Sequence, residues 1–258
     1  MSAKTTIGIA LSGGGPRGVA HVGALQALAE NGIVADVVAG TSAGAIVGAL
    51  HCAGKTTDEM LDFAKQFTLY KFLKFGFPHG GVMTLKALKD KLLLLIPENS
   101  FEKLEKPLHV VVTNLNIGEE EIVSSGKLID FIIASSAVPL VFESVEINGI
   151  NYADGGLMNN LPANVLHPIC DMVIGINVMP HINVSSENLN SLMGVGMRTF
   201  DLAIWSNTKF SIPYCDVVIE PKALAGINMF NTDKLDFFYE VGYNEALKHI
   251  DQIKMYLK

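Results

Sequence analysis

The chain is short of the residues on which several classes of protein depend. Its 258 residues include only three cysteines, Cys52, Cys170 and Cys215, which are scattered and odd in number. No C-x-x-C pair occurs, so neither a zinc or redox centre nor a disulfide framework is expected. The three thiols are interpreted as small buried apolar groups in a reducing compartment.

Charge is also scarce, and positive charge most of all. Charged residues make up 17% of the sequence, and the formal net charge is -7. Because phosphate binding requires a basic face and no basic run is present, a nucleic-acid partner is not expected. The only block of like charge, Glu119-Glu120-Glu121, is predicted to lie on a solvated turn.

Long apolar runs are absent as well. No stretch approaches the roughly 20 residues that span a bilayer, and the first strand-like run is too short for the core of a signal peptide. A soluble, cytoplasmic protein without signal peptide or transmembrane segment is therefore predicted. What the sequence does have is 49% hydrophobic residues, enough for a thick and largely covered core.

The order of the predicted elements indicates an α/β protein. Strands at 6–11 and 36–39 alternate with helices at 19–31 and 43–53, and this βαβα start predicts parallel pairing. Later strands are expected at 108–114, 172–178 and 217–219, helices at 57–74, 84–96, 186–207 and 232–257, and a hairpin at Asn148-Gly149. Without a repeat or a linker, residues 1–258 are predicted to form a single domain.

A glycine loop, LSGGGPRG, joins the first strand to the first helix. A dinucleotide site would need an acidic residue at the end of the second strand, and Asp36 stands at its start. A second phosphate-binding candidate, CAGKTT, has Ala49 where a P-loop requires glycine, and no strand leads into it. Both nucleotide interpretations are rejected.

The second strand runs into Gly40-x-Ser42-x-Gly44, followed by an apolar helix. This placement is typical of a nucleophile elbow, where a serine on a sharp strand-to-helix turn projects its hydroxyl outward. The flanking glycines avoid a collision where strand and helix cross. Ser42 would also lie at a helix N-terminus, where partial positive charge favours a developing oxyanion.

The glycine loop and the elbow explain each other. Acyl transfer to serine passes through a tetrahedral oxyanion that needs preorganised N–H donors. The loop stands at the carboxyl end of the neighbouring strand, and its glycines allow backbone amides to converge. Its candidate oxyanion-binding residues are Gly13, Gly14, Gly15, Arg17 and Gly18.

A base for Ser42 is less obvious. None of the seven histidines (His21, His51, His79, His109, His167, His181 and His249) stands in a recognisable catalytic context. Asp154 follows the hairpin and enters Gly155-Gly156, so a buried carboxylate at a strand end could accept the serine proton directly. The alternative interpretation of this Asp-Gly-Gly sequence is an ordinary turn.

Taken in order, the glycine loop with arginine, G-x-S-x-G and D-G-G resemble the patatin-like phospholipase family. The likeness extends to RGVAHVGALQAL, ASSAVPLVFESVEINGINYADGGLMNNLP and EVGYNEAL, and covers most of the chain from Gly13 to about Leu247. One departure is Ser12, where many relatives carry an acidic residue; this position is interpreted as structural.

The resemblance implies a three-layer α/β/α sandwich with a mostly parallel central sheet. It also implies hydrolysis of phospholipid, lysophospholipid or neutral-lipid esters by a Ser–Asp dyad, without a metal or other cofactor. Carried over by position, Ser42 is the nucleophile and Asp154 the base. Gly14, Gly15 and Arg17 hold the oxyanion, with Gly13 and Gly18 shaping the loop.

Two rival functions stay open. A Ser–His–Asp esterase of the α/β-hydrolase type would use His167, His181 or His249, and a non-catalytic relative would only bind acyl chains or membrane. Peripheral membrane contact is a further expectation, because FAKQFTLYKFLKFGFPHGGVM reads equally as an interfacial lid or as a packed helix. A weaker candidate of the same kind is ALAGINMFNTDKLDFFY. The sequence gives no oligomeric state.

Overall fold

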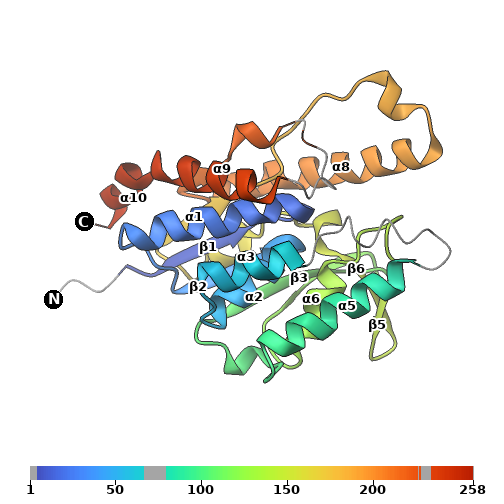
Figure 1. Ribbon diagram of the computed structural model, residues 1–258, viewed down its shortest axis with the longest axis horizontal. Helices are drawn as coiled ribbons and strands as arrows, with labels where there is room; N and C mark the ends of the chain where they lie inside the picture. Colours follow the sequence, from blue (N-terminus) through green and yellow to red (C-terminus); the bar gives the residue numbers. More distant parts are fainter. Residues whose placement is uncertain (1–4, 67–79, 226, 228–233, 258) are drawn as a thin grey trace.

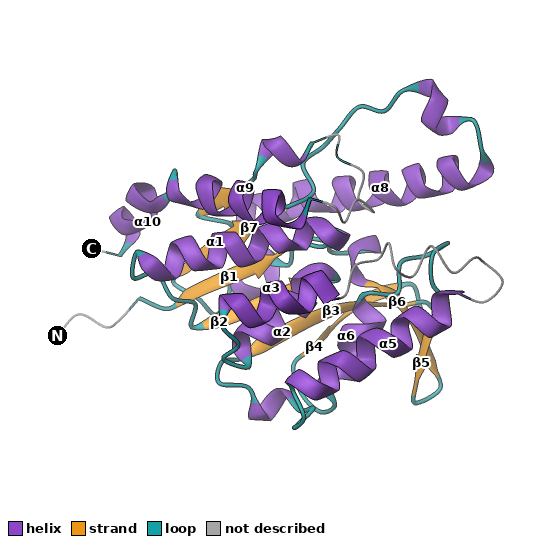
Figure 2. Cartoon of the chain, viewed as in Figure 1, coloured by secondary structure: helices purple, strands orange, loops and turns teal. Residues whose placement is uncertain are grey.

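A computed structural model describes residues 5–66, 80–225, 227 and 234–257 (Figure 1). Over these residues the chain forms one twisted sheet with helices on both faces (Figure 2), which confirms the predicted α/β sandwich. Most of the aromatic candidate lid lies outside the described residues. Its first aromatic residue, Phe63, is buried in the core.

Eight strands make up the sheet in the described part of the chain. They are β1 (Ile7–Leu11), β2 (Val37–Thr41), β3 (Leu108–Asn114), β4 (Glu119–Val123), β5 (Val145–Ile147), β6 (Ile150–Asp154), β7 (Met172–Ile176) and β8 (Val217–Ile219). Their order is β5-β6-β3-β2-β1-β7-β8, with β4 paired to β3. The pairs from β3 through β2, β1 and β7 to β8 are parallel, and those joining β4, β5 and β6 are antiparallel.

The helices divide unequally between the two faces. One face carries α1 (Val19–Glu30), α2 (Ala43–Cys52), α3 (Thr57–Gln66), α5 (Gly80–Leu95), α6 (Leu128–Ser135), α9 (Leu235–Leu247) and α10 (Ile250–Tyr256), all contributing to the main core. The other face carries the short α7 (Ala163–Leu166). The long α8 (Leu192–Ser211) packs against the turns at 155–157 and 212–214.

Alternation along the strands builds both layers at once, as the period of two requires. In β1, Ile9 and Leu11 belong to the main core, whereas Ala10 between them belongs to the small cluster under α7. Five consecutive residues of β1 are therefore buried. A continuous apolar run is what a parallel strand covered on both faces needs.

Helices α1 and α9 touch at the level of their backbones. A methyl group at Gly23 of α1 would lie 2.1 Å from the Tyr239 carbonyl oxygen. One at Gly242 of α9 would lie 2.0 Å from the Ala20 carbonyl oxygen. Only glycine permits this approach, so the crossing closes the fold by joining the C-terminal part of the chain to its first helix.

Three predictions about elements were wrong. Residues Glu119–Glu121 are not a turn but begin β4, where Glu121 accepts hydrogen bonds from Tyr152 and Asn114. Helix α6 was missed, because its run of apolar residues reads as well as a strand. The single helix expected at 232–257 is two helices, since the Lys248 and His249 amides bond three residues back and end α9.

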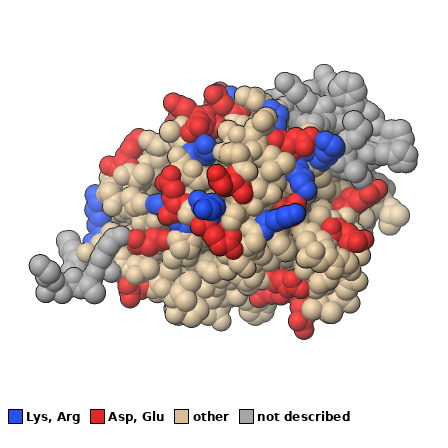
Figure 3. Space-filling model, turned by 90° about the horizontal axis from the view of Figure 1, so that it is seen from below, with Lys and Arg blue, Asp and Glu red and all other residues tan. Residues whose placement is uncertain are grey.

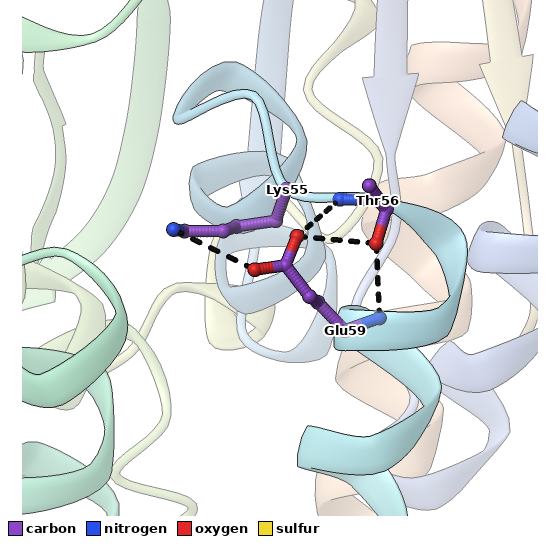
Figure 4. Close-up of polar contacts among 3 residues, drawn as sticks. All are labelled: Lys55, Thr56 and Glu59. Atoms are coloured by element: carbon purple, nitrogen blue, oxygen red, sulfur yellow. Dashed lines mark hydrogen bonds and ion pairs between the residues drawn. The ribbon is translucent and has the colours of Figure 1, made fainter.

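The segment CAGKTT contributes a helix cap. Thr56 precedes α3, its hydroxyl accepts from the Glu59 amide at 3.2 Å, and the Glu59 carboxylate accepts from the Thr56 amide at 2.8 Å (Figure 4). Lys55 lies 3.8 Å from the same carboxylate. This reciprocal capping box occupies the residues that a P-loop would use for phosphate.

Charges on the face seen from below alternate in sign, with lysines and arginines lying among acidic residues and wide uncharged areas (Figure 3). Among the described residues of this face, no stripe of a single sign is seen. An electrostatic field that attracts an anion would need such a stripe.

The α1–α9 crossing yields the first prediction. Replacing Gly23 with alanine should lower the free energy of unfolding by about 2 to 3 kcal/mol, because the added methyl group forces two backbones apart. Gly48→Ala in α2 is the matched control, since the nearest atoms to a methyl there belong to the side chains of Leu108, Val38 and Leu11 and not to a backbone. Urea titration of both variants measures the difference, and equal midpoints would contradict the close crossing.

Candidate active site

Two strands meet end to end along one edge of β3. Residues 110 and 111 of β3 pair with β2 on one side and β4 on the other, and residues 112–114 pair with β4 and β6. Since a strand has only two edges, β6 continues along the edge that β2 leaves. Thr41 stands opposite Val111, and Asp154 stands opposite Val112. The residue after β2, Ser42, is thereby brought to the last residue of β6, Asp154.

Ser42 sits on a strained turn between β2 and α2. Its φ of 53° and ψ of -118° lie in a region that residues other than glycine rarely adopt. A methyl group at Gly44 would lie 2.2 Å from the Leu11 carbonyl oxygen, and one at Gly40 would lie 2.5 Å from the Gly44 carbonyl oxygen. The two glycines of the motif are thus required by close packing of strand and helix.

Neighbouring polar groups fix this turn. The Ser42 amide donates to the Ser135 hydroxyl at 2.8 Å, and that hydroxyl donates to the Val111 carbonyl at 2.6 Å. The Thr41 hydroxyl donates to the Asn159 carbonyl at 2.8 Å, in the loop after Asp154. The strain at Ser42 is therefore supported from the sheet, from α6 and from the Asp-Gly-Gly loop.

Asp154 is buried, with 2% of its surface exposed. Its carboxylate accepts the Gly156 amide at 2.8 Å and is hydrogen-bonded to the Ser42 side chain. Burial raises the pKa of the carboxyl from 3.8 to about 7, and the bonds from Ser42 and Gly156 offset part of the rise. A carboxyl with this pKa holds or releases a proton near neutral pH.

Gly155 follows the carboxylate directly, and the first turn after it packs on β3. A methyl group at Gly155 would lie 2.3 Å from the Val111 carbonyl oxygen, and one at Gly156 would lie 2.9 Å from Asp154 Oδ1. Both motif glycines therefore lie against the Asp154 carboxylate or the strand beneath it.

The glycine loop lies beside Ser42, and its members differ in what their amides do. The Gly13 amide donates to the Asn160 carbonyl at 3.1 Å. Gly14 and Gly15 donate to no acceptor within the described residues, and Gly15 opens a 3-10 turn over Gly15–Gly18. Gly18 packs against Ala43, since a methyl group there would lie 2.7 Å from the Ala43 Cβ. The amides of Gly14 and Gly15 are the ones left for an anion.

Ser12 is structural in its contacts. Its hydroxyl accepts from the Val178 amide at 2.9 Å and donates to the Gly13 carbonyl at 2.9 Å. It ties the glycine loop to the end of β7. Its carbonyl accepts from Nε2 of His21 at 2.8 Å, and burial lowers the pKa of His21 to about 4, so this ring is neutral.

Arg17 is buried, with 4% of its surface exposed. Its Nε lies 3.5 Å from the Gly14 carbonyl oxygen. Burial lowers the pKa of the guanidinium, and attraction to Asp201 of α8 offsets part of the change. Arg17 thus brings a buried positive charge to the glycine loop.

The described histidines make their contacts elsewhere. His167 packs edge-on against Tyr214, His181 lies 4.0 Å from the Trp205 ring, and Nδ1 of His249 bonds Gln252. His51 lies at the far end of α2, about 13 Å along the helix from Ser42. His79 lies outside the described residues. The described contacts connect Ser42 to a carboxylate and not to an imidazole.

Sequence reasoning missed several residues that shape the site. Ser135 supports Ser42, and Asn207 of α8 bonds the loop after Asp154. Ser135 lies in the ASSAVPL segment quoted above, but nothing in that segment indicates its contact with Ser42. No quoted segment contains Asn207, which acts on the site from a helix far along the chain. Over the described residues, no group of three or more His, Cys, Asp and Glu side chains is arranged to hold a metal ion.

The buried carboxyl predicts a pH-dependent effect on stability. The folded state prefers protonated Asp154, so the cost of its charge is absent below about pH 4 and complete above about pH 7. Asp154→Asn removes that cost, and its gain in unfolding free energy should grow with pH, by at most about 4 kcal/mol. Urea titrations at pH 4.5 and pH 8 measure it, with exposed Asp251→Asn as control. An equal gain at both pH values would contradict the raised pKa.

The sequence is related to known proteins. A family model described as Patatin-like phospholipase matches residues 9–167, more than half of the chain. An uncharacterized NTE family protein of Mycobacterium tuberculosis is 31% identical over 215 residues, which cover 78% of this chain and 59% of that protein. Human patatin-like phospholipase domain-containing protein 6 is 30% identical over 202 residues, which cover 74% of this chain but 14% of the relative.

The fold has a solved counterpart. VipD from Legionella pneumophila superimposes with a TM-score of 0.56 at 15% identity, covering 97% of this chain and 67% of that one. That likeness concerns the arrangement of the sheet and its helices. The family match and the sequence identities show membership: the chain belongs to the patatin-like phospholipase family.

Proposed function

We propose that the protein is a serine acyl hydrolase of lipid esters, a carboxylic ester hydrolase of the phospholipase A or lysophospholipase kind. The observation that carries the proposal is the hydrogen bond between Ser42 and a buried carboxylate whose pKa is raised to about 7. Family membership supports a lipid substrate. A protein that only binds acyl chains needs neither a strained serine nor a buried base beside it.

In the proposed reaction, ionised Asp154 takes the proton of the Ser42 hydroxyl while Oγ forms a bond to the acyl carbonyl carbon. The carbonyl π electrons move to oxygen, and the C–O bond to the leaving group then breaks. Asp154 returns its proton to the departing alkoxide, which leaves as an alcohol or lysolipid. Water attacks the acyl-enzyme with the same carboxylate as base, and the fatty acid and free serine are released.

The oxyanion formed in both half-reactions would face the glycine loop. The amides of Gly14 and Gly15 have no acceptor in the described part of the chain. At the start of α2 the Ala45 and Ile46 amides donate to the Ser42 carbonyl, whereas Ala43 and Gly44 stand too early in the helix to have an intrahelical acceptor. Buried Arg17 adds positive charge nearby. Donors fixed in a dry site stabilise charge without reorganisation, which is the largest single contribution in many acyl transfers.

Substitution of the two reacting residues tests the dyad. Ser42→Ala should lower hydrolysis of a soluble p-nitrophenyl ester by about 10³-fold or more and abolish fluorophosphonate labelling. Asp154→Asn should lower it by about 10² to 10⁴-fold while the fold persists. Because the base must be ionised, the labelling rate of the unaltered protein should rise with pH and level off above about 7.

The rival mechanism supplies the control variants. Alanine at His167, His181 or His249 should leave labelling of Ser42 within about twofold of the unaltered rate. Loss of labelling in one of them would favour a Ser–His–Asp esterase. A protein that stays unlabelled altogether would instead be a binding module.

We further propose that the protein contacts its lipid surface through the outer side of α8. Its N-terminal half, with the loop before it, projects from the body of the molecule (Figure 1). Exposed positions recur at helical spacing, and most carry apolar side chains: Leu192, Met193, Val195, Leu202 and Phe210. An outward apolar face of this kind is typical of helices that lie on a membrane surface.

Three of the polar side chains on or beside this outer face have partners within the protein. The Thr199 hydroxyl donates to the Val195 carbonyl at 2.9 Å, and Arg198 donates to the Ile182 carbonyl at 3.0 Å. The Lys209 ammonium lies 3.4 Å from the centre of the Trp205 ring. With a formal net charge of -7, the protein suits a zwitterionic or neutral surface rather than an anionic one.

Vesicle sedimentation tests this surface. In a Ser42→Ala background, which spares the lipid, the chain should sediment with phosphatidylcholine vesicles, and Leu192→Asp with Leu202→Asp should abolish the binding. Leu247→Asp with Met255→Asp, two exposed apolar residues at the opposite end of the molecule, should bind as before. Binding that survives the α8 substitutions would contradict the proposal. The proposal would also be contradicted if light scattering showed a dimer that the Leu192→Asp and Leu202→Asp substitutions dissociate.

A further inference from the structure

The inner side of α8 holds the loop that follows Asp154. The Asn207 side-chain amide donates to the Gly156 carbonyl at 2.8 Å and to the Leu157 carbonyl at 3.2 Å. Its Oδ1 accepts the Asn160 amide at 2.9 Å. One side chain therefore forms hydrogen bonds with three backbone groups of a loop about fifty residues earlier in the chain.

We propose that Asn207 is a positioning residue for the Asp154 carboxylate, an inference that rests on the function proposed above. The link is Gly156, which is bound from two directions. Its amide donates to Asp154 Oδ1 at 2.8 Å, and its carbonyl accepts from Asn207. The carbonyl belongs to the 156–157 peptide plane, which joins the plane of the donating amide at the Gly156 Cα. Holding that carbonyl therefore restricts rotation about the Gly156 Cα, and so limits how far the amide can turn away from the carboxylate.

The same side chain reaches the glycine loop through Asn160. The Asn160 amide donates to Asn207, and the Asn160 carbonyl accepts the Gly13 amide at 3.1 Å. The Asn160 side chain is fully buried, and its Oδ1 would lie 2.5 Å from a methyl group at Gly13 and 3.2 Å from one at Gly156. Asn207 thus joins the loop of the base to the loop of the oxyanion.

Helix α8 is anchored firmly enough for this task. Its buried residues Phe200, Ile204, Thr208 and Ser211 face the body of the protein. Ile204 would lie 3.4 Å from a methyl group at Gly156, and the Ser211 hydroxyl donates to Asn159 Oδ1 at 3.4 Å. The helix therefore meets the loop through packing as well as through hydrogen bonds.

The chemistry of the three contacts selects asparagine. Two carbonyls must receive donors and one amide needs an acceptor, which only a carboxamide supplies from one short side chain. Aspartate at this position would keep the bond from Asn160 and lose both donors. Alanine would lose all three contacts, leaving the Gly156 carbonyl without its partner.

Steady-state kinetics on a soluble p-nitrophenyl ester test the proposal. Asn207→Ala and Asn207→Asp should each lower kcat by about 10 to 100-fold with KM within about twofold, because loss of base alignment affects the chemical step. The hydrogen bond from the Gly156 amide lowers the pKa of Asp154. Both variants should weaken this hydrogen bond, so the acid limb of the fluorophosphonate labelling profile should move to higher pH. Ser206→Ala and Ser206→Asp, at the exposed neighbouring position, are the controls and should keep the kcat and midpoint of the unaltered protein.

Unaltered kcat and pH midpoint in Asn207→Ala would overturn the proposal, and so would a rise in KM alone. If that variant does not fold, Asn207→Asp decides, because it fills nearly the same volume and replaces both N–H donors with a carboxylate oxygen, and Ser206→Asp controls for the added charge. An Asn207→Asp variant with the kcat of the unaltered protein would also overturn the proposal. The dyad is tested separately. An active Ser42→Ala variant refutes the proposed function. An inactive Ser42→Ala variant, together with Asn207 variants that keep the kcat and pH midpoint of the unaltered protein, refutes this inference alone.

Discussion

The site depends on the way two strands share one edge of β3. β2 runs along that edge to Thr41, and β6 arrives from the opposite direction and stops at Asp154, one register position further. Neither strand can advance without displacing the other. The turn after β2 must therefore rise out of the sheet, and this turn carries Ser42. Sheet register alone brings the hydroxyl and the carboxylate into hydrogen-bonding contact.

This arrangement destabilises the folded state, and the features that destabilise it are the ones on which the proposed chemistry depends. Ser42 occupies backbone angles that favour glycine, and Asp154 lies in surroundings that disfavour its charge. Hydrogen bonds that involve Ser135, Gly156 and Thr41 stabilise this geometry, but they do not return the pKa of Asp154 to its ordinary value. A carboxylate that gains little from its surroundings is a better proton acceptor. At Asp154, the burial that disfavours the charged form in the folded state is also what strengthens the carboxylate as a base.

The two faces of the sheet have different tasks in this fold. The main core under α1, α2 and α6 is deep, and the backbone contact between α1 and α9 closes it. The other face has a short α7 and the partly projecting α8, whose inner side bonds the loop after Asp154. An element that borders the site on one side and exposes apolar residues on the other suits an ester that arrives in a lipid surface. The chain spans 59% of its mycobacterial relative and 14% of its human one, so this unit is embedded in longer proteins there.

The sequence by itself determined everything that local geometry dictates. A serine between two glycines after a buried strand specifies the turn, because no larger residue fits where Leu11 and Gly44 meet. The glycine loop and the carboxylate before two glycines were recognisable for the same reason. Short continuous apolar runs placed most strands, and this signal failed at Glu119–Glu121, where pairing with β3 outweighed the low strand propensity of glutamate.

Only the tertiary structure decided which of these local pieces meet. Ser42 and Asp154 are 112 positions apart, and their contact follows from the register of β3, which no local pattern encodes. The roles of Ser135 and Asn207 could not be predicted either, since a polar residue on a helix is ordinary until its helix packs against the site. The raised pKa of Asp154 likewise arises from burial by distant segments. Local chemistry follows the chain, whereas burial and long-range hydrogen bonds follow the fold.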